Sequence, residues 1–177
     1  MENTLKGKAV NESRTTFTQL VMPNDANPLG NLMGGNIMKW MDIAGGICAA
    51  KHSGNFVVTA SVDNVSFKSP VKVGDVITIN AQVTRAFSTS VEVFIEVFAT
   101  TMHSDIPVKS NNAYFTFVAL DPKTFKPTPI RPVVPVSDDE VKRYEGASRR
   151  RELRLVLGGK MDPKDAKDLR QYFREMD

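Results

Sequence analysis

Apolar residues change their spacing along this chain from helical to alternating, and the change separates a helix from a sheet. In residues 35–52, Ile37, Met41, Ala44 and Cys48 recur at helical spacing, so one continuous apolar face is predicted. After residue 55 apolar and polar residues alternate, which is typical of strands whose sheet is buried on one face. The sequence therefore predicts one long helix followed by a sheet.

Several strand-forming runs, separated by turn residues, surround this helix in the sequence. They lie at residues 15–22, 56–67, 77–84, 91–98 and 112–120. Consecutive antiparallel strands around a lone central helix give an α+β domain. Within the helix, Gly45 and Gly46 each cost about 1 kcal/mol of helix propensity relative to alanine, so we expect something to pack very close to them.

The C-terminal part begins with a proline-rich stretch, Pro127–Pro135, which is predicted to be an extended connector rather than a strand or a helix. Ser137, with Glu140 three residues later, forms a capping-box pattern and predicts a helix that runs to about Leu157. A last short helix is predicted within residues 163–176.

These patterns divide the chain into three parts. Residues 1–13 are mostly polar and lack periodicity, so a flexible N-terminus is predicted. Residues 14–126 form the main domain, and residues 127–177 form the connector with its helical extension. Because no internal repeat is detected, we expect one copy of the domain rather than two fused copies.

The composition excludes several kinds of partner and site. With 23 basic and 20 acidic residues, the formal net charge of +3 gives little support for nucleic-acid binding. No stretch approaches the roughly 20 apolar residues of a membrane span and no secretory signal is evident, so a cytoplasmic protein is expected. His52 and His103 lack metal-ligand spacing, so no metal is predicted. The single cysteine, Cys48, is interpreted as an inert core residue.

An ordered set of motifs along residues 15–152 resembles the signature of the acyl-CoA thioester hydrolase family of hotdog proteins, in its single-domain bacterial form. The motifs are Pro-Asn-Asp-Ala-Asn-Pro-Leu-Gly-Asn-Leu-Met-Gly-Gly at 23–35, Asn-Ile-Met-Lys-Trp-Met-Asp at 36–42, Val-Thr-Ala-Ser-Val-Asp at 58–63, Phe67, Pro70, Val-Gly-Asp at 73–75 and Lys-Arg-Tyr-Glu at 142–145.

The resemblance implies the hotdog fold, in which an antiparallel sheet wraps around one long central helix. It implies hydrolysis of acyl-CoA to a carboxylic acid and CoA, without a metal or a cofactor. It also implies a homo-oligomer whose minimal unit is a dimer and whose full form is a trimer of dimers. Met33 stands where many hotdog thioesterases have a histidine, so a histidine-based mechanism at that place is excluded.

Gly34 and Gly35 lie at the start of the predicted helix, where backbone N–H groups lack intrahelical acceptors and the helix dipole favours negative charge. Such amides could stabilise the oxyanion that forms during thioester hydrolysis. A helix N-terminus that merely packs on the sheet would explain the same residues, and the resemblance favours the oxyanion hole.

Asp42 follows Met41 of the apolar face, where an ionised carboxylate is costly unless it is paired or functional. Seven residues of helix place it about 10 Å from Gly35, too far for both to touch one carbonyl. Asp42 is therefore predicted to serve the glycines of the partner subunit, as general base or as nucleophile. A carboxylate at the wet margin of the apolar face is the alternative.

Polar residues outside the helix complete the predicted site. In related enzymes a polar residue in the loop before the glycines is credited with catalysis, and here this residue is Asn31, which could position water or the thioester carbonyl. Turn formation is the alternative for Asn31. By resemblance, the residues along the CoA path are Val58, Thr59, Arg85, Ser88 and Ser90.

Arg149 and Arg150 belong to a basic run on the predicted terminal helix. We hypothesise that one or more of these arginines bind the nucleotide phosphates of CoA, although a solvated helix face is the more common meaning of such a run. The tail at 160–177 could dock a partner through its helix-spaced apolar residues, or pack on the parent oligomer.

Two other functions fit the same fold. A dehydratase would need an acid–base pair that normally includes a histidine, and none lies beside the glycines. A non-catalytic acyl-CoA sensor would bind its ligand without turnover. The combination of Asn31 with Asp42 favours catalysis, and no DNA-binding helix pair precedes the domain.

Overall fold

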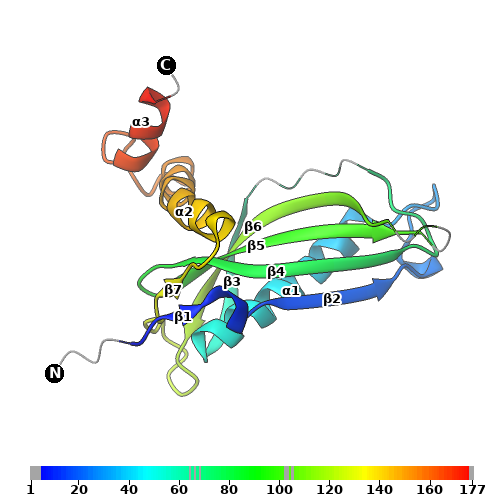
Figure 1. Ribbon diagram of the computed structural model, residues 1–177, viewed down its shortest axis with the longest axis horizontal. Coiled ribbons are helices and arrows are strands. Elements are labelled where there is room, and N and C mark those ends of the chain that lie inside the picture. Colours follow the sequence, from blue (N-terminus) through cyan, green and yellow to red (C-terminus); the bar gives the residue numbers. More distant parts are fainter. Residues whose placement is uncertain are drawn as a thin grey trace. The chain divides into compact units, whose positions relative to one another are not determined.

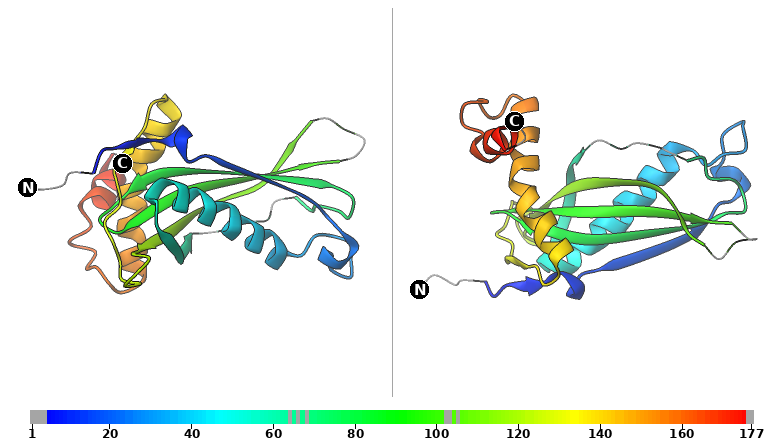
Figure 2. Two further views of the ribbon diagram at one scale, coloured as in Figure 1. Left: turned by 90° about the horizontal axis from the view of Figure 1, so that it is seen from below. Right: turned by 45° about the horizontal axis from the view of Figure 1, so that its top comes forward.

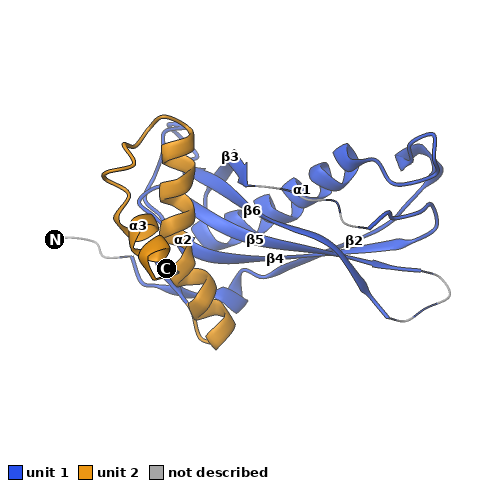
Figure 3. Cartoon of the chain, turned by 90° about the horizontal axis from the view of Figure 1, so that it is seen from above, with its two compact units in different colours: residues 1–134 blue, residues 135–177 orange. Residues whose placement is uncertain are grey.

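The computed structural model describes residues 5–63, 65, 67, 69–101, 104 and 106–175. The chain forms two compact units, Met1–Val134 and Pro135–Asp177, which Figure 3 shows in different colours. In the described residues, no helix is long and apolar enough to cross a membrane.

The first unit is an antiparallel five-stranded sheet with one long helix, α1 (Gly34–Ser53), along one of its faces (Figures 1 and 2). The strand order is β2-β4-β5-β6-β3, and all five strands contact α1. The strands are β2 (Thr15–Leu20), β3 (Phe56–Asp63), β4 (Val76–Ala86), β5 (Ser90–Thr100) and β6 (Val108–Leu120). The predicted α+β hotdog architecture is confirmed, with a curled sheet around one central helix.

The close approach of α1 to the sheet depends on one of its two adjacent glycines. A Cβ on Gly45 would lie 2.8 Å from Cδ1 of Ile95 and 2.9 Å from Cζ of Phe117, so no larger residue fits without movement. A Cβ on Gly46 would have its nearest neighbour, a ring atom of Phe117, at 3.8 Å. The predicted close contact is therefore confirmed for Gly45, whereas Gly46 has space for a side chain.

Strand β3 lies at one edge of the sheet and pairs only with β6 among the described strands. It ends at Asp63, so the prediction of a strand through residue 67 is wrong at its end. The last pair joins Asp63 to Tyr114, although β6 itself continues to Val108 and keeps its pairing with β5. Residues 64 and 66 of the predicted run lie outside the described residues. Most of the residues of β3 are exposed.

Two short segments join the ends of the first unit. β1 (Lys8–Ala9) pairs in parallel with β7 (Val133–Val134), and the 3-10 helix η1 (Val10–Glu12) follows with Val10 buried. Regular backbone therefore begins inside the predicted flexible N-terminus. The connector was predicted to contain no strand, and this is wrong for Val133–Val134, two β-branched residues between prolines.

The second unit contains α2 (Asp138–Leu157) and α3 (Lys167–Arg174). The predicted capping box is confirmed, because Ser137 Oγ accepts a hydrogen bond from the Glu140 amide and the Glu140 carboxylate accepts one from the Ser137 amide. The last predicted helix is present over a shorter range, and its expected end at residue 176 lies outside the described residues.

Candidate active site

A loop closed by Asn27 leads into the helix α1. The Asn27 side-chain oxygen accepts hydrogen bonds from the amides of Leu29 and Asn31, at 3.0 and 3.2 Å. The Asn27 amide in turn donates to the carbonyl of Asn31 at 2.7 Å. Gly30 completes the turn with a φ of +74°, which glycine adopts without strain. One asparagine thus fixes the backbone of the predicted site residue Asn31, whose side chain is half-buried.

A second set of contacts fixes the first turn of α1. The Asp25 carbonyl accepts hydrogen bonds from the Met33 amide at 2.9 Å and from Nδ2 of Asn36 at 3.2 Å. The Met33 carbonyl accepts from the amides of Asn36 and Ile37. Asp25 therefore anchors the helix start.

The amides of Gly34 and Gly35 take no part in this network. In the described part of the chain, no hydrogen bond starts from either N–H group. A Cβ on Gly34 would lie 3.2 Å from the ring of Phe67, whereas nothing lies within 4 Å of a Cβ on Gly35. Both amides are at the positive end of the helix dipole, so the helix start presents donors to an open space.

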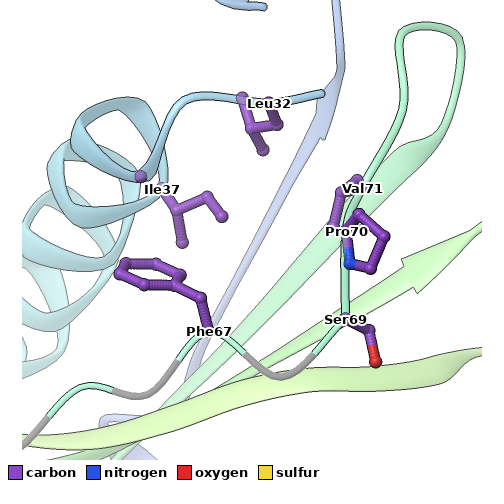
Figure 4. Close-up of a pocket in the computed structure, with 7 residues that line it drawn as sticks. Leu32, Ile37, Phe67, Ser69, Pro70 and Val71 are labelled. Atoms are coloured by element: carbon purple, nitrogen blue, oxygen red, sulfur yellow. The ribbon is translucent and has the colours of Figure 1, made fainter. Parts of the chain in front are cut away.

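An apolar pocket of about 310 Å³ adjoins the first of these glycines, Gly34 (Figure 4). Its lining residues are Leu32, Gly34, Ile37, Phe67, Ser69, Pro70 and Val71. In Figure 4, Ile37 and Phe67 lie on one side, while Pro70 and Val71 face them from the other. The space can accept an apolar group whose polar end reaches the glycine amides.

Asp42 is exposed, on the face of α1 that lies next to β3. The hydroxyl of Thr59, in β3, donates a hydrogen bond to Oδ1 of Asp42 at 2.5 Å, and Thr59 is exposed as well. Along the helix, Asp42 is seven residues from Gly35, or about 10 Å. The structure thus joins Thr59 to Asp42 and keeps this pair apart from the glycine amides of the same chain.

The other CoA-path candidates of the first unit gather near one end of the sheet. Val58 lies opposite Val118, which lies opposite Ser90, so the outer two are about 10 Å apart in one row across three strands. Because Thr59 and its neighbour Phe117 face α1, this row faces away from the helix. Ser90 is buried.

Arg85 and Ser88 belong to the strand ends and turn beside that row. The Arg85 guanidinium lies 5.8 Å from the centroid of the Phe87 ring. Ser88 is exposed, and its carbonyl accepts a hydrogen bond from the Ile130 amide. Of the predicted CoA path, Thr59 thus contacts the Asp42 carboxylate, while Val58 and Ser90 face the other side of the sheet.

Arg149 and Arg150 already have partners within the second unit. The Arg149 guanidinium lies over the Tyr172 ring at 4.2 Å, and Nη2 of Arg150 donates to the Arg143 carbonyl at 2.7 Å. Burial also lowers the pKa of the neighbouring Arg151. Their role toward CoA phosphates stays a prediction.

Burial shifts the pKa values of two side chains in the first unit, Cys48 and His52. Burial raises the pKa of the Cys48 thiol to about 12, so a thiolate nucleophile is not available there. Burial also lowers the pKa of His52, whose Nε2 lies 3.1 Å from the Arg131 carbonyl. Among the described residues, which do not include His103, no cluster of three or more His, Cys, Asp or Glu could hold a metal ion.

Comparison with known proteins gives a consistent picture. Residues 29–105 match the thioesterase superfamily. An acetyl-coenzyme A thioesterase of Mus musculus is 38% identical over 78% of this chain, although the chain spans only 25% of that relative's length.

Solved structures match over nearly their whole length. A hexameric acyl-CoA thioesterase superposes with a TM-score of 0.83 at 35% identity, covering 87% of this chain and 98% of that one. An acyl-CoA hydrolase of Staphylococcus aureus, in complex with butyryl-CoA, CoA and CoA disulfide, has a TM-score of 0.80 at 32% identity and covers 94% and 98%. Structures of that hydrolase also exist in which an aspartate, a threonine or an asparagine is replaced by alanine.

Proposed function

Because the chain belongs to the acyl-CoA thioester hydrolases of the thioesterase superfamily, we propose that it hydrolyses acyl-CoA to a carboxylic acid and CoA. The observation that carries this proposal is the pair of amides at Gly34 and Gly35, which have no acceptor among the described residues, with Gly34 at the wall of an apolar pocket. The pocket takes the start of the acyl chain, and the amides meet the thioester carbonyl. No metal or cofactor has a part in this chemistry.

The amides act when the carbonyl carbon becomes tetrahedral. Its oxygen then carries the negative charge that the N–H groups and the helix dipole stabilise. Collapse of this intermediate breaks the carbon–sulfur bond and releases the CoA thiolate. Of the two glycines, Gly35 is the less crowded, since no neighbouring side chain among the described residues lies within 4 Å of a Cβ placed there.

Asp42 supplies the other half of the reaction. As a general base it takes a proton from the attacking water; as a nucleophile it forms an anhydride that water then hydrolyses. Thr59 holds the carboxylate in place through its hydrogen bond. Single turnover in ¹⁸O-labelled water tests the nucleophilic role, because label in Asp42 arises only when water attacks the aspartyl carbonyl of the anhydride.

A second copy of the chain brings the two halves together. Within one subunit, Asp42 and Gly35 are about 10 Å apart along the helix axis, too far for one carbonyl. β3 is an edge strand with exposed apolar residues, and such an edge is a template for pairing with another chain. We propose a dimer in which each site uses Asp42 of one subunit and the glycines of the other, and three dimers per hexamer, since a similar thioesterase is hexameric.

Asn27 joins the site residues that sequence reasoning proposed. In the S. aureus hydrolase, the replaced asparagine, aspartate and threonine are spaced along the chain as Asn27, Asp42 and Thr59 are here. The side-chain oxygen of Asn27 accepts the hydrogen bonds that hold the loop, so the side-chain NH₂ group of Asn27 is the part that can donate to a substrate or to water. Asn31 keeps a positioning role beside it. In the sequence, Asn27 belongs to the family motif at 23–35 but has no predicted role, because the spacing of these three residues gains meaning only beside the S. aureus hydrolase.

The remaining assignments are proposals of the same kind. Val58, Ser88, Ser90 and Arg85 border the CoA path, with Arg149 and Arg150 as phosphate ligands. Residues 14–126 form the catalytic domain and residues 127–177 its extension. The enzyme works in the cytoplasm, as the name of a cytosolic acyl-CoA thioester hydrolase of Rattus norvegicus indicates for that relative.

The direct test measures thiol release from acyl-CoAs of graded chain length. Wild-type protein is expected to turn over, and Asp42→Ala to lose about 100-fold or more in kcat, the usual contribution of a general base. Asp165→Ala, which removes an exposed carboxylate of the second unit, is the matched control and should keep full activity. Tight binding of acyl-CoA without any turnover by the wild type would instead identify a sensor.

A further inference from the structure

Phe125 has a backbone conformation that a bulky residue rarely adopts. Its φ is +54°, and it is the only residue other than glycine with a positive φ in the described part of the chain. The side chain is nevertheless 65% exposed, so burial of the ring does not compensate for the strain. Strain of this kind persists where the surrounding structure fixes the residue, and it is concentrated at ligand-binding sites.

The loop that holds Phe125 is closed by Asp121. One carboxylate oxygen of Asp121 accepts hydrogen bonds from the Thr124 amide at 2.8 Å, the Thr124 hydroxyl at 3.0 Å and the Lys123 amide at 3.0 Å. The Phe125 amide donates to the Asp121 carbonyl at 2.9 Å. These hydrogen bonds to Thr124 and Lys123 lower the pKa of Asp121, so its charge is committed to the loop itself. The ring of Phe125 is therefore presented by a rigid frame.

A second exposed ring lies parallel to the first. Phe56, at the start of β3, is 58% exposed, and its ring is stacked with that of Phe125 at a centroid distance of 6.3 Å and an interplanar angle of 9°. Phe56 is two residues before Val58, so both point to the same face of the sheet, away from α1. The aromatic pair thus adjoins, on the same face of the sheet, Val58 of the predicted CoA path.

The charges beside this pair suit an anionic ligand. Lys123 and Lys126 flank Phe125 in the same loop, and both are exposed. Exposed flat rings with adjacent cations bind the base and the phosphates of a nucleotide, because a base stacks on the ring and the ammonium groups meet the phosphates.

We propose that the Phe56–Phe125 pair stacks against the adenine ring of the CoA portion of the substrate, with Lys123 and Lys126 at its phosphates. This inference rests on the proposed acyl-CoA hydrolysis and deepens it by assigning the nucleotide end. It gives the strained loop a purpose, which is to display one ring beside the other at a fixed height above the sheet.

The test uses two substrates that share the thioester: an acyl-CoA and the same acyl group on pantetheine, which lacks the nucleotide. Phe125→Gly removes the ring and also the backbone strain. We expect KM for acyl-CoA to rise about tenfold, the usual effect of losing one stacked base, while kinetics with acyl-pantetheine stay unchanged. The melting temperature should stay equal or rise, which a purely structural ring would not allow.

Matched variants complete the design. Phe56→Leu should also raise KM for acyl-CoA without changing the kinetics with acyl-pantetheine. Lys123→Gln combined with Lys126→Gln should weaken the binding of acyl-CoA, and the effect should be larger at low salt than at high salt. Phe173→Ala is the control, since that ring is 56% exposed in the second unit.

The outcomes separate this inference from the proposed function. If the ring variants change KM equally for both substrates, or for neither, the inference is overturned, while turnover by the wild type still supports the thioesterase. A change in oligomer size without a change in KM would show that the rings bind a second copy instead. Absence of wild-type turnover with both substrates would contradict the proposed hydrolysis itself.

Discussion

Asp42 and Thr59 form a hydrogen-bonded pair between two exposed side chains from different elements. A lone exposed carboxylate on a helix can sample several rotamers, whereas the Thr59 hydroxyl favours one of them. The pair therefore presents one carboxylate oxygen in a fixed direction. In the proposed mechanism Thr59 therefore acts through Asp42, as a positioning residue.

The Thr59→Val variant keeps the shape of the side chain and removes the hydroxyl. We expect kcat to fall about tenfold, which corresponds to the loss of one hydrogen bond to a charged group, with little change in KM. Thr59→Ser retains the hydroxyl and should recover most of the activity. Steady-state kinetics of the wild type, Thr59→Val and Thr59→Ser measure this effect. An unchanged kcat in Thr59→Val would show that the hydrogen bond has no catalytic role.

The residues of the site could be predicted from sequence only where a local rule applies. Gly34 and Gly35 follow from the position of a helix N-terminus, and Asp42 follows from a charge beside an apolar face. The Asp42–Thr59 contact joins residues 17 positions apart on a helix and a strand, and no local pattern encodes it. Likewise, Asn27 has the composition of a turn, and its role in holding Asn31 depends on the folded loop.

At the scale of elements, the contact between α1 and the sheet depends on which glycine faces the strands. The helical period predicted a close approach at the glycine pair but could not separate Gly45 from Gly46, because the direction of each depends on how the sheet curls. The end of β3 at Asp63 likewise depends on tertiary structure, since the strand leaves β6 there although β6 continues to Val108. Capping is a local signal, and the Ser137–Glu140 box was accordingly predictable.

The two glycines provide a matched pair of substitutions. Gly46→Ala should stabilise the protein by up to about 1 kcal/mol, because the new methyl group has space and alanine is the better helix former. Gly45→Ala should destabilise it by about 1–3 kcal/mol, since the methyl group would meet Ile95 and Phe117 at under 3 Å. Urea unfolding at one fixed protein concentration measures both. Stabilisation by Gly45→Ala would mean that the helix lies farther from the sheet than described.

At the scale of the whole molecule, one chain carries the glycine amides and the carboxylate of the proposed site but does not bring them together. The glycine amides and the Asp42 carboxylate lie about 10 Å apart along one helix, and the exposed edge strand β3 lies beside Asp42. A site that needs both groups within about 3 Å of one carbonyl therefore requires a second subunit. The sequence predicted this sharing from helix geometry alone, whereas the strand edge that can support it became visible only in the folded chain.

The most direct measurement mixes two inactive variants. Asp42→Asn lacks the base, and Gly35→Pro lacks one amide donor at a helix position where proline is tolerated. If the site is shared, each mixed dimer contains one intact site and one doubly defective site, so unfolding and refolding an equal mixture should restore about a quarter of wild-type activity, from the half of dimers that are mixed. If both groups act within one chain, every site in the mixture stays defective and no activity returns, which would contradict the shared site.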